Sequence, residues 1–121
     1  MSKPHILVVE DQPEFQQALS YRLEAQGFQV EIAEDAAAAE LCLGIRHFDV
    51  VLLKDILADG PSDASLRNWR HQGKNMPVIM MTTLPSPDPL NGVPKHADGA
   101  IARPFAISDL IVEIERVTVA S

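Results

Sequence analysis

The sequence is poor in cysteine, in positive charge and in long apolar runs. Cys42 is the only cysteine, so no internal disulfide can form, and its apolar helical surroundings favour a buried structural thiol. Only 10 Lys and Arg stand against 17 Asp and Glu, and they are scattered, whereas nucleic-acid surfaces need clustered cations. No apolar run reaches transmembrane length and no signal-peptide pattern opens the chain. We therefore expect a reducing, cytoplasmic protein that contacts neither nucleic acid nor membrane.

Two further kinds of site have no support in the sequence. The four histidines lack the mutual spacing of metal ligands: His5, His47, His71 and His96. No Gly-rich or hydroxyl-rich phosphate loop follows the first apolar run, where Glu10 and Asp11 would repel a phosphate lacking a metal. An enzyme or flavin carrier is therefore disfavoured, and we expect no enzymatic activity.

Short apolar runs alternate with helical patterns along the whole chain, which suits one domain over 1–121 with no output domain after it. The expected strands are 5–9, 28–32, 50–53, 77–82 and 100–102. The expected helices are 13–26, a segment from a cap at Asp35 to 44–47, one from Ser62 or Asp63 to 73, and one from a cap at Ser108. Prolines disfavour a helix over 84–96. This pattern predicts an α/β fold, a doubly wound five-stranded parallel sheet with its fourth helix short or disrupted.

Charged and hydroxyl side chains follow several expected strands. Because the carboxyl ends of parallel strands meet at one edge of a sheet, these side chains can converge on one site. They are Glu10 and Asp11, Lys54 and Asp55, Thr82 and Thr83, and Arg103.

Four motifs resemble the receiver domain of two-component response regulators, similar to the chemotaxis receiver. They are Ile-Leu-Val-Val-Glu-Asp at 6–11, Phe-Asp-Val-Val-Leu-Leu at 48–53, Pro-Val-Ile-Met-Met-Thr at 77–82 and Ala-Asp-Gly-Ala-Ile-Ala-Arg-Pro-Phe at 97–105. The resemblance implies a flavodoxin-like strand order 2-1-3-4-5. It also implies that Glu10 and Asp11 stand at the Mg²⁺ positions, and Thr82 at the hydroxyl position that contacts the phosphoryl group.

Three positions depart from the receiver pattern. Lys54 stands where the family has its phosphoacceptor Asp, and lysine cannot form an acyl phosphate. Arg103 stands at the position of the phosphoryl-contacting Lys, with a planar fork in place of a point ammonium. Ala100 stands at the aromatic switch position. These changes indicate a degenerate receiver.

Lys54 suggests how such a site could be stable. Converging carboxylates repel one another, and a divalent ion normally relieves that repulsion. The Lys54 ammonium can reach Glu10 and Asp11 and supply the positive charge permanently, in which case no cofactor is needed. In the alternative interpretation Asp55 is the phosphoacceptor, with Mg²⁺ on Glu10 and Asp11. Strand alternation opposes it, although a bulge could re-aim Asp55.

The expected function is therefore that of a signalling module. We expect a phosphorylation-independent pseudo-receiver that binds a regulatory protein, such as a histidine kinase, a phosphotransfer protein or a separate output protein. The alternative is a working phosphoacceptor response regulator that uses Asp55 and Mg²⁺.

Overall fold

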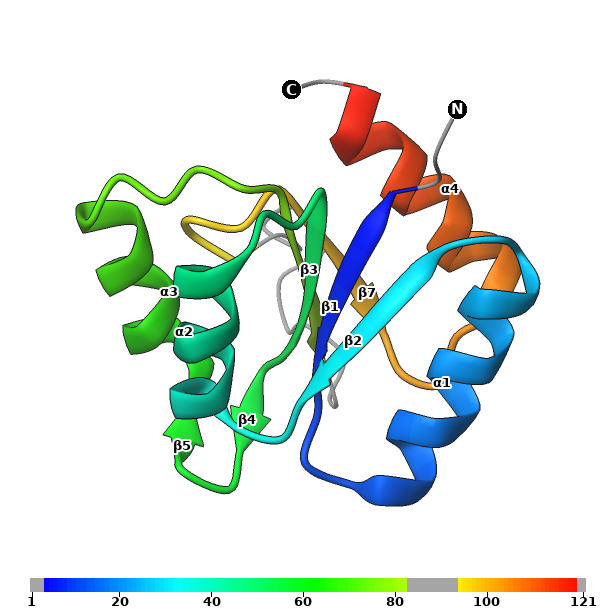
Figure 1. Cartoon of the computed structure of the whole chain (residues 1–121), viewed down its shortest axis with the longest axis horizontal. Coiled ribbons are helices and arrows are strands. Elements are labelled where there is room, and N and C mark those ends of the chain that lie inside the picture. Colours follow the sequence, from blue (N-terminus) through cyan, green and yellow to red (C-terminus); the bar gives the residue numbers. More distant parts are fainter. Residues whose placement is uncertain (1–3, 83–93, 120–121) are drawn as a thin grey trace.

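Five parallel strands form the centre of this computed structural model, which describes residues 4–82 and 94–119. They are β1 (His5–Val9), β2 (Gln29–Ala33), β3 (Val50–Lys54), β6 (Val78–Thr82) and β7 (Gly99–Ala102). Their order across the sheet is β2-β1-β3-β6-β7, and each neighbouring pair is parallel (Figure 1). The predicted doubly wound sheet and its flavodoxin-like order are confirmed.

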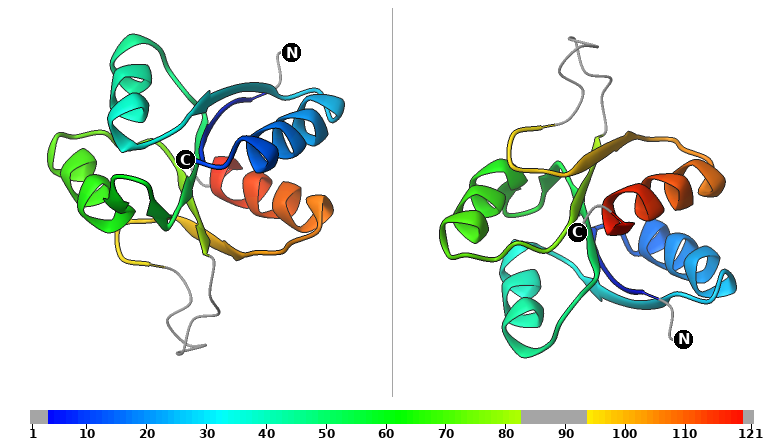
Figure 2. Two further views of the ribbon diagram at one scale, coloured as in Figure 1. Left: turned by 90° about the horizontal axis from the view of Figure 1, so that it is seen from below. Right: turned by 90° about the horizontal axis from the view of Figure 1, so that it is seen from above.

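Helices cover both faces of this sheet. They are α1 (Pro13–Ala25), α2 (Ala36–Ile45), α3 (Ser62–His71) and α4 (Ile107–Val119). Figure 2 shows α1 and α4 side by side on one face, with α2 and α3 on the opposite face. The result is a three-layer arrangement in which the sheet edge at the carboxyl ends of the strands stays open to side chains from several elements.

Strand β3 shows why the layers form. Every residue of its Val-Val-Leu-Leu-Lys sequence is buried. Because side chains alternate along a strand, Val50 and Leu52 pack into the core beneath α1 and α4, while Val51 and Leu53 pack into the core beneath α2 and α3. A continuous apolar run therefore fills two cores at once, as expected for a central parallel strand.

Several helix ends follow the predicted signals and two do not. Asp35 caps α2, its carboxylate accepting the Ala38 N–H at 2.8 Å, and Gly27 ends the α1 region with φ +94°. Ser62, however, is the first residue of α3 rather than its cap, because its hydroxyl donates to the Lys54 carbonyl oxygen. Ser108 lies inside the first turn of α4, which already begins at Ile107.

The connection between β3 and α3 holds two short strands that the sequence did not predict. β4 (Ile56–Leu57) and β5 (Gly60–Pro61) pair antiparallel in a small hairpin. Gly60 has φ +120°, a conformation that residues with a side chain rarely adopt. The expected interruption of the fourth helix over 84–96 lies, up to residue 93, outside the described residues.

Arg70 of α3 ties two loops to the sheet. Its guanidinium donates to the carbonyl oxygens of Lys74, Met76 and His96 at 2.8 to 2.9 Å and pairs with the Asp98 carboxylate at 2.9 Å. One Asp98 oxygen also accepts the Val78 N–H at 2.8 Å. The chain segments that enter β6 and β7 are therefore both anchored to α3.

Candidate functional site

The carboxyl edge of the sheet brings three charged side chains onto one face. Val9 of β1 lies opposite Leu53 of β3, so the next residues, Glu10 and Lys54, also lie opposite each other. Alternation along both strands puts these two on the face covered by α1 and α4. Arg103 follows β7 two residues after Ile101, which packs into that same core. Glu10 and Lys54 meet because the neighbouring strands β1 and β3 end in step, whereas Arg103 reaches Glu10 from the end of β7, which lies two strands beyond β3.

Lys54 bridges the two acidic residues that follow β1. Its Nζ lies 2.8 Å from Oδ1 of Asp11 and 3.2 Å from Oε2 of Glu10. Only 9% of the Lys54 side chain is exposed, and the Glu10 side chain is fully buried. The contact that the sequence analysis expected of Lys54 is therefore present, and it is made away from bulk solvent.

Glu10 is held from several sides. Its Oε2 accepts the backbone N–H groups of Asp11 at 2.8 Å and Gln12 at 3.3 Å, while its own carbonyl oxygen accepts the Gln16 side-chain amide. Its other carboxylate oxygen, Oε1, lies 3.0 Å from an η nitrogen of Arg103. These two atoms form an ion pair whose alignment is not that of a hydrogen bond. A buried carboxylate thus faces two cations.

Arg103 also packs on an aromatic ring of α1. Its guanidinium carbon lies 3.7 Å from the centre of the Phe15 ring, a cation–π contact. Phe15 in turn meets Phe105 edge-on, with ring centres 6.2 Å apart. Arg103 therefore joins the buried Glu10 to the surface where α1 meets the start of α4.

The electrostatics of the cluster favour its charged form. The hydrogen bond from Lys54 holds the pKa of the Asp11 carboxyl below its usual value, although burial acts in the opposite direction. Burial alone would lower the pKa of Lys54, but its hydrogen bonds to Asp11 and Glu10 outweigh that effect and raise it. Both members of the Lys54–Asp11 pair are therefore charged at neutral pH.

The arrangement does not fit the Mg²⁺ that the receiver resemblance implies. The Lys54 ammonium contacts both carboxylates that would bind the ion, and Oε2 of Glu10 already accepts backbone N–H groups. Within 4–82 and 94–119, no group of three or more His, Cys, Asp or Glu could hold a metal ion. Lys54 and Arg103 place positive charge beside these carboxylates.

Asp55 directly follows β3. Its N–H donates to the Met81 carbonyl at 3.0 Å and its carbonyl accepts the Ser62 N–H at 2.8 Å. Its carboxylate accepts the Ile56 N–H at 2.9 Å. Asp55 therefore lies at a bend directly after β3, with its backbone N–H still bonded to β6, and this carboxylate contact is to its own neighbour Ile56 rather than to the Lys54 cluster.

Thr82, the last residue of β6, and Ala100 of β7 lie on strands that end at the same edge as the cluster, but both make their contacts outside it. The Thr82 hydroxyl donates to the Ile101 carbonyl at 3.4 Å. The Ala100 N–H donates to Oε2 of Glu113 on α4 at 3.2 Å, and its methyl group packs against the core beneath α2 and α3. The structure therefore brings Glu10, Asp11, Lys54 and Arg103 together and does not add these two positions to the cluster.

Sequence reasoning missed the residues that support the cluster. Phe15 is not among the site residues that the sequence analysis predicts, yet its ring carries the Arg103 guanidinium. The sequence analysis predicts Ser62 only as a possible helix cap, yet its hydroxyl binds the backbone carbonyl of Lys54. The spacing of Phe15 from Pro13, which begins α1, was the available signal, because it puts an aromatic ring in the first turn beside the strand ends.

Comparison with known proteins places the chain among signalling proteins. The profile of the response regulator receiver domain matches residues 6–115. Swarming motility regulation protein RssB of Serratia marcescens is 35% identical over 114 residues, which cover 93% of this chain and 52% of that protein. This chain spans about half the length of the curated relatives that it matches first.

Solved structures agree on the fold. The receiver domain of response regulator 1452 from Francisella superposes with a TM-score of 0.87 at 24% identity, covering 96% of this chain and 97% of that one. The chemotaxis protein CheY4 of Vibrio cholerae superposes with a TM-score of 0.85 at 25% identity, over 96% and 99% of the two chains. None of the described helices has the length and apolar character needed to cross a membrane. By its motifs, its strand order and this profile match, the chain belongs to the response regulator receiver domain family.

Proposed function

We propose that this domain is a phosphorylation-independent pseudo-receiver that acts in two-component signalling by binding a regulatory protein. The contact between Lys54 and the acidic pair Glu10 and Asp11 carries the proposal. In a receiver that is phosphorylated, the net charge at the carboxyl ends of the strands changes when the metal ion and the phosphoryl group bind. Here a covalently attached ammonium supplies a constant positive charge, so one arrangement of the strand ends is stabilised at all times.

The chemistry of residue 54 supports the same conclusion. A carboxylate can accept a phosphoryl group as a mixed anhydride, whereas the ammonium of Lys54 is protonated and has no lone pair to attack phosphorus. Its pKa is raised by hydrogen bonds to Asp11 and Glu10, even though burial would lower it. Deprotonation, which would make it a nucleophile, is therefore opposed by the site itself.

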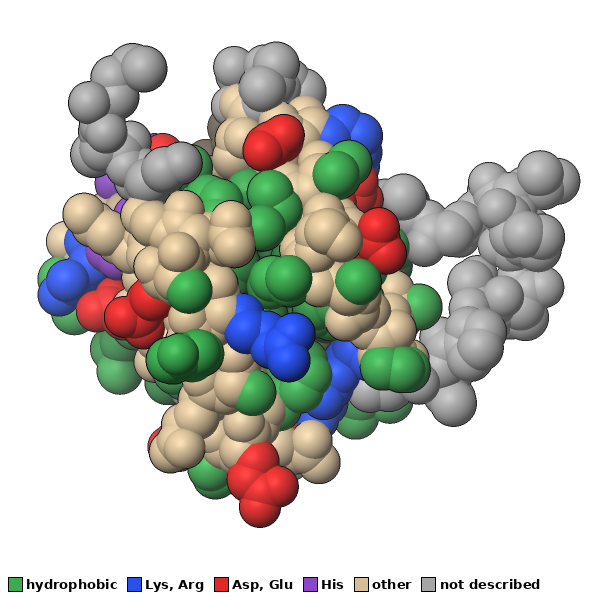
Figure 3. All heavy atoms as spheres, turned by 90° about the vertical axis from the view of Figure 1, so that its right-hand side faces the viewer, with side chains coloured by type: hydrophobic (Ala, Val, Ile, Leu, Met, Phe, Trp, Pro, Cys, Tyr) green, Lys and Arg blue, Asp and Glu red, His purple; other side chains and the backbone are tan. Residues whose placement is uncertain are grey.

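The surface over α1 and α4 is the best candidate for the protein partner. Figure 3 shows basic side chains at the centre of this surface, surrounded by hydrophobic ones. A groove there is lined by Phe15, Ala18, Leu19, Arg22, Phe105 and Ile107. Since Arg103 links the Phe15 ring to the buried Glu10, the constant charge of the cluster also holds this surface in one form.

The partner that suits this surface is a protein of the same signalling system. A histidine kinase, a phosphotransfer protein and a separate output protein are the candidate classes. In each case binding would depend on the α1 and α4 surface and not on the phosphorylation state of this chain.

Intact mass spectrometry tests the proposal. The native protein, Lys54→Asp and Asp55→Asn are incubated with acetyl phosphate and Mg²⁺. We expect the native protein to gain no phosphoryl group, while a gain by Lys54→Asp shows that the pocket accepts phosphate once a carboxylate is restored. A phosphoryl gain by the native protein that Asp55→Asn abolishes would contradict the proposal and establish Asp55 as the acceptor.

A further inference from the structure

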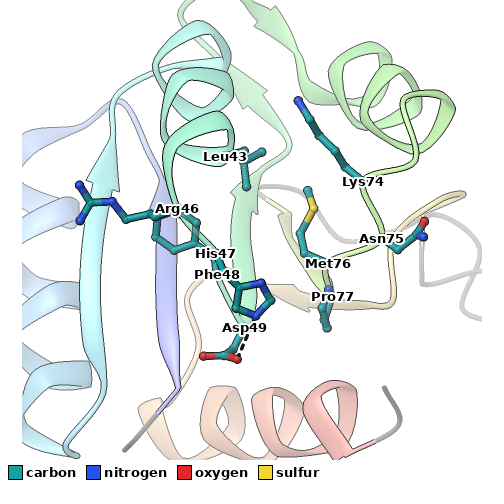
Figure 4. Close-up of a pocket in the computed structure, with 9 residues that line it drawn as sticks. All are labelled: Leu43, Arg46, His47, Phe48, Asp49, Lys74, Asn75, Met76 and Pro77. Carbon is teal, nitrogen blue, oxygen red and sulfur yellow. Dashed lines mark ion pairs between the residues drawn. The ribbon is translucent and has the colours of Figure 1, made fainter.

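A groove lies at the opposite edge of the sheet from Lys54, between the chain segments that enter β3 and β6. Figure 4 shows it bounded on one side by His47 to Asp49 and on the other by Lys74 to Pro77. Its volume is about 430 Å³. This size lies within the range of small-molecule sites, about 300 to 1,000 Å³.

Hydrogen bonds fix both walls of this groove. The Asp49 carboxylate accepts the His5 N–H at 2.7 Å, which ties one wall to β1. Arg70 binds the carbonyl oxygens of Lys74 and Met76 at 2.9 and 2.8 Å, which ties the other wall to α3. The groove is therefore preformed, and a ligand would not have to order it on binding.

The lining combines apolar side chains, those of Leu43, Phe48, Met76 and Pro77, with polar and charged ones, and the charged ones differ in whether they are paired. Arg46 pairs with Glu31 at 3.4 Å and points away from the groove, while His47 pairs with Asp49 at 3.4 Å (Figure 4). The Lys74 ammonium makes no hydrogen bond or ion pair with any residue of 4–82 or 94–119.

In the view of Figure 4, Lys74 stands at the end of the groove that holds Leu43, and Asp49 stands at the opposite end. Met76 lies between them on the wall. A ligand that spans the groove would therefore meet a cation at one end, apolar groups in the middle and a carboxylate at the other end.

We propose that this groove binds a small amphipathic monocarboxylate, with its apolar body on Leu43 and Met76 and its carboxylate on Lys74. Among the groove residues, Lys74 is the cation that has no partner within 4–82 and 94–119, and its single positive charge matches a single negative charge on the ligand. Asp49 and the net charge of −7 would repel a ligand with more than one negative charge. The site is independent of the proposed function, because none of its residues belongs to the Lys54 cluster.

A ¹H–¹⁵N NMR titration of the full chain tests this site. The probe is 4-phenylbutyrate, with the uncharged 4-phenylbutanamide and acetate as matched ligands that lack the charge or the apolar body. We expect saturable shifts at 43–49 and 74–77 with 4-phenylbutyrate, weaker binding of the amide and none of acetate. An acetylated Leu-Glu-Leu peptide is titrated as a further ligand, to test for a peptide-binding groove. The proposal would be overturned if the acid and the amide bound equally, if acetate alone produced the shifts, or if only the peptide produced them.

Two lysine variants separate the charge contact from general electrostatics. Lys74→Gln should weaken 4-phenylbutyrate binding by about threefold, the size of an exposed ion pair, and leave amide binding unchanged. Lys95→Gln removes an equal charge from an exposed position outside the groove and should change neither. Equal weakening by both variants would show that Lys74 is not a ligand.

Discussion

The ammonium of Lys54 lies 3.2 Å from the fully buried carboxylate of Glu10, on the adjacent strand of the sheet. A buried carboxylate is costly unless it is paired, and here Lys54 and Arg103 approach its two oxygens separately. Two cations of the chain therefore contact the acidic residues at the sheet edge where the receiver resemblance implies a metal ion. The predictions below follow from these contacts.

Removing the Lys54 charge should destabilise the fold. Lys54→Met keeps much of the side-chain volume but leaves Glu10 and Asp11 facing each other with Arg103 as the remaining cation. We expect the free energy of unfolding to fall by about 3 kcal/mol, the size seen when one partner of a buried pair is lost. Urea unfolding measures it. Lys95→Met, an exposed control, should change the value by no more than about 0.5 kcal/mol; similar losses in both variants would refute the role of Lys54.

The contribution of the Lys54–Asp11 pair should depend on pH at both extremes. The Asp11 pKa is lowered by its hydrogen bond from Lys54, so its stabilisation is present above about pH 4 and is lost as pH falls through the folded-state value. The Lys54 pKa is raised, because its hydrogen bonds outweigh burial. Its stabilisation is therefore present below about pH 10.4 and is lost as pH rises through the folded-state value.

Unfolding measured in parallel for the native protein and Lys54→Met checks this dependence. The difference in free energy of unfolding should be constant from about pH 5 to pH 9 and should shrink below about pH 4. A difference that stays unchanged in acid would mean that Lys54 stabilises the fold by packing and not by charge.

The Arg103 guanidinium should be coupled to the Phe15 ring. Arg103→Lys keeps the charge but loses the flat group that lies 3.7 Å above the ring. We expect a loss of about 1 kcal/mol, and a smaller loss when Phe15 is already Leu. A double-mutant cycle with Arg103→Lys and Phe15→Leu measures the coupling energy. Strictly additive effects would show that the stacking contributes nothing.

The sequence predicted the fold through signals that are local and strong. The strand at Val50 to Leu53 is continuously apolar because it is buried on both faces. Asp35 caps α2 by accepting the N–H of Ala38, which lies only three residues further along the chain. The β4–β5 hairpin was missed because Ile56 and Leu57 form only a two-residue strand, too short to show a period.

The sequence predicts the part of the candidate site that depends on where strands end and which charged residues follow them. The Lys54 contact with Glu10 and Asp11 followed from strand order and side-chain length. The contact of Arg103 with Phe15 could not be predicted in this way, because it depends on how α1 packs beside the end of β7. Arg70 was missed for the same reason, since three of its partners are backbone carbonyls, which carry no sequence signal.

Gly99 should resist substitution although it lies in a strand. A methyl group there would come within 2.6 Å of the Glu113 carboxylate, which accepts the Ala100 N–H, and 2.9 Å of Arg116. We expect Gly99→Ala to cost about 1 kcal/mol through the displaced hydrogen bonds. Gly44→Ala, where a methyl group meets nothing within 4 Å in α2, should instead stabilise by about 0.5 to 1 kcal/mol. Thermal unfolding of both variants compares them, and equal behaviour would contradict the contact.

The response of thermal stability to Mg²⁺ tests the central claim most directly. The native protein and Lys54→Asp are unfolded with MgCl₂ and with NaCl of equal ionic strength. We predict that Mg²⁺ leaves the native Tm unchanged, because Lys54 occupies the charge position, and raises the Tm of Lys54→Asp, which regains a carboxylate site for the ion. A Tm of the native protein that rises specifically with Mg²⁺ would show that the ion still binds at Glu10 and Asp11, and the account of Lys54 as a permanent internal cation would be wrong.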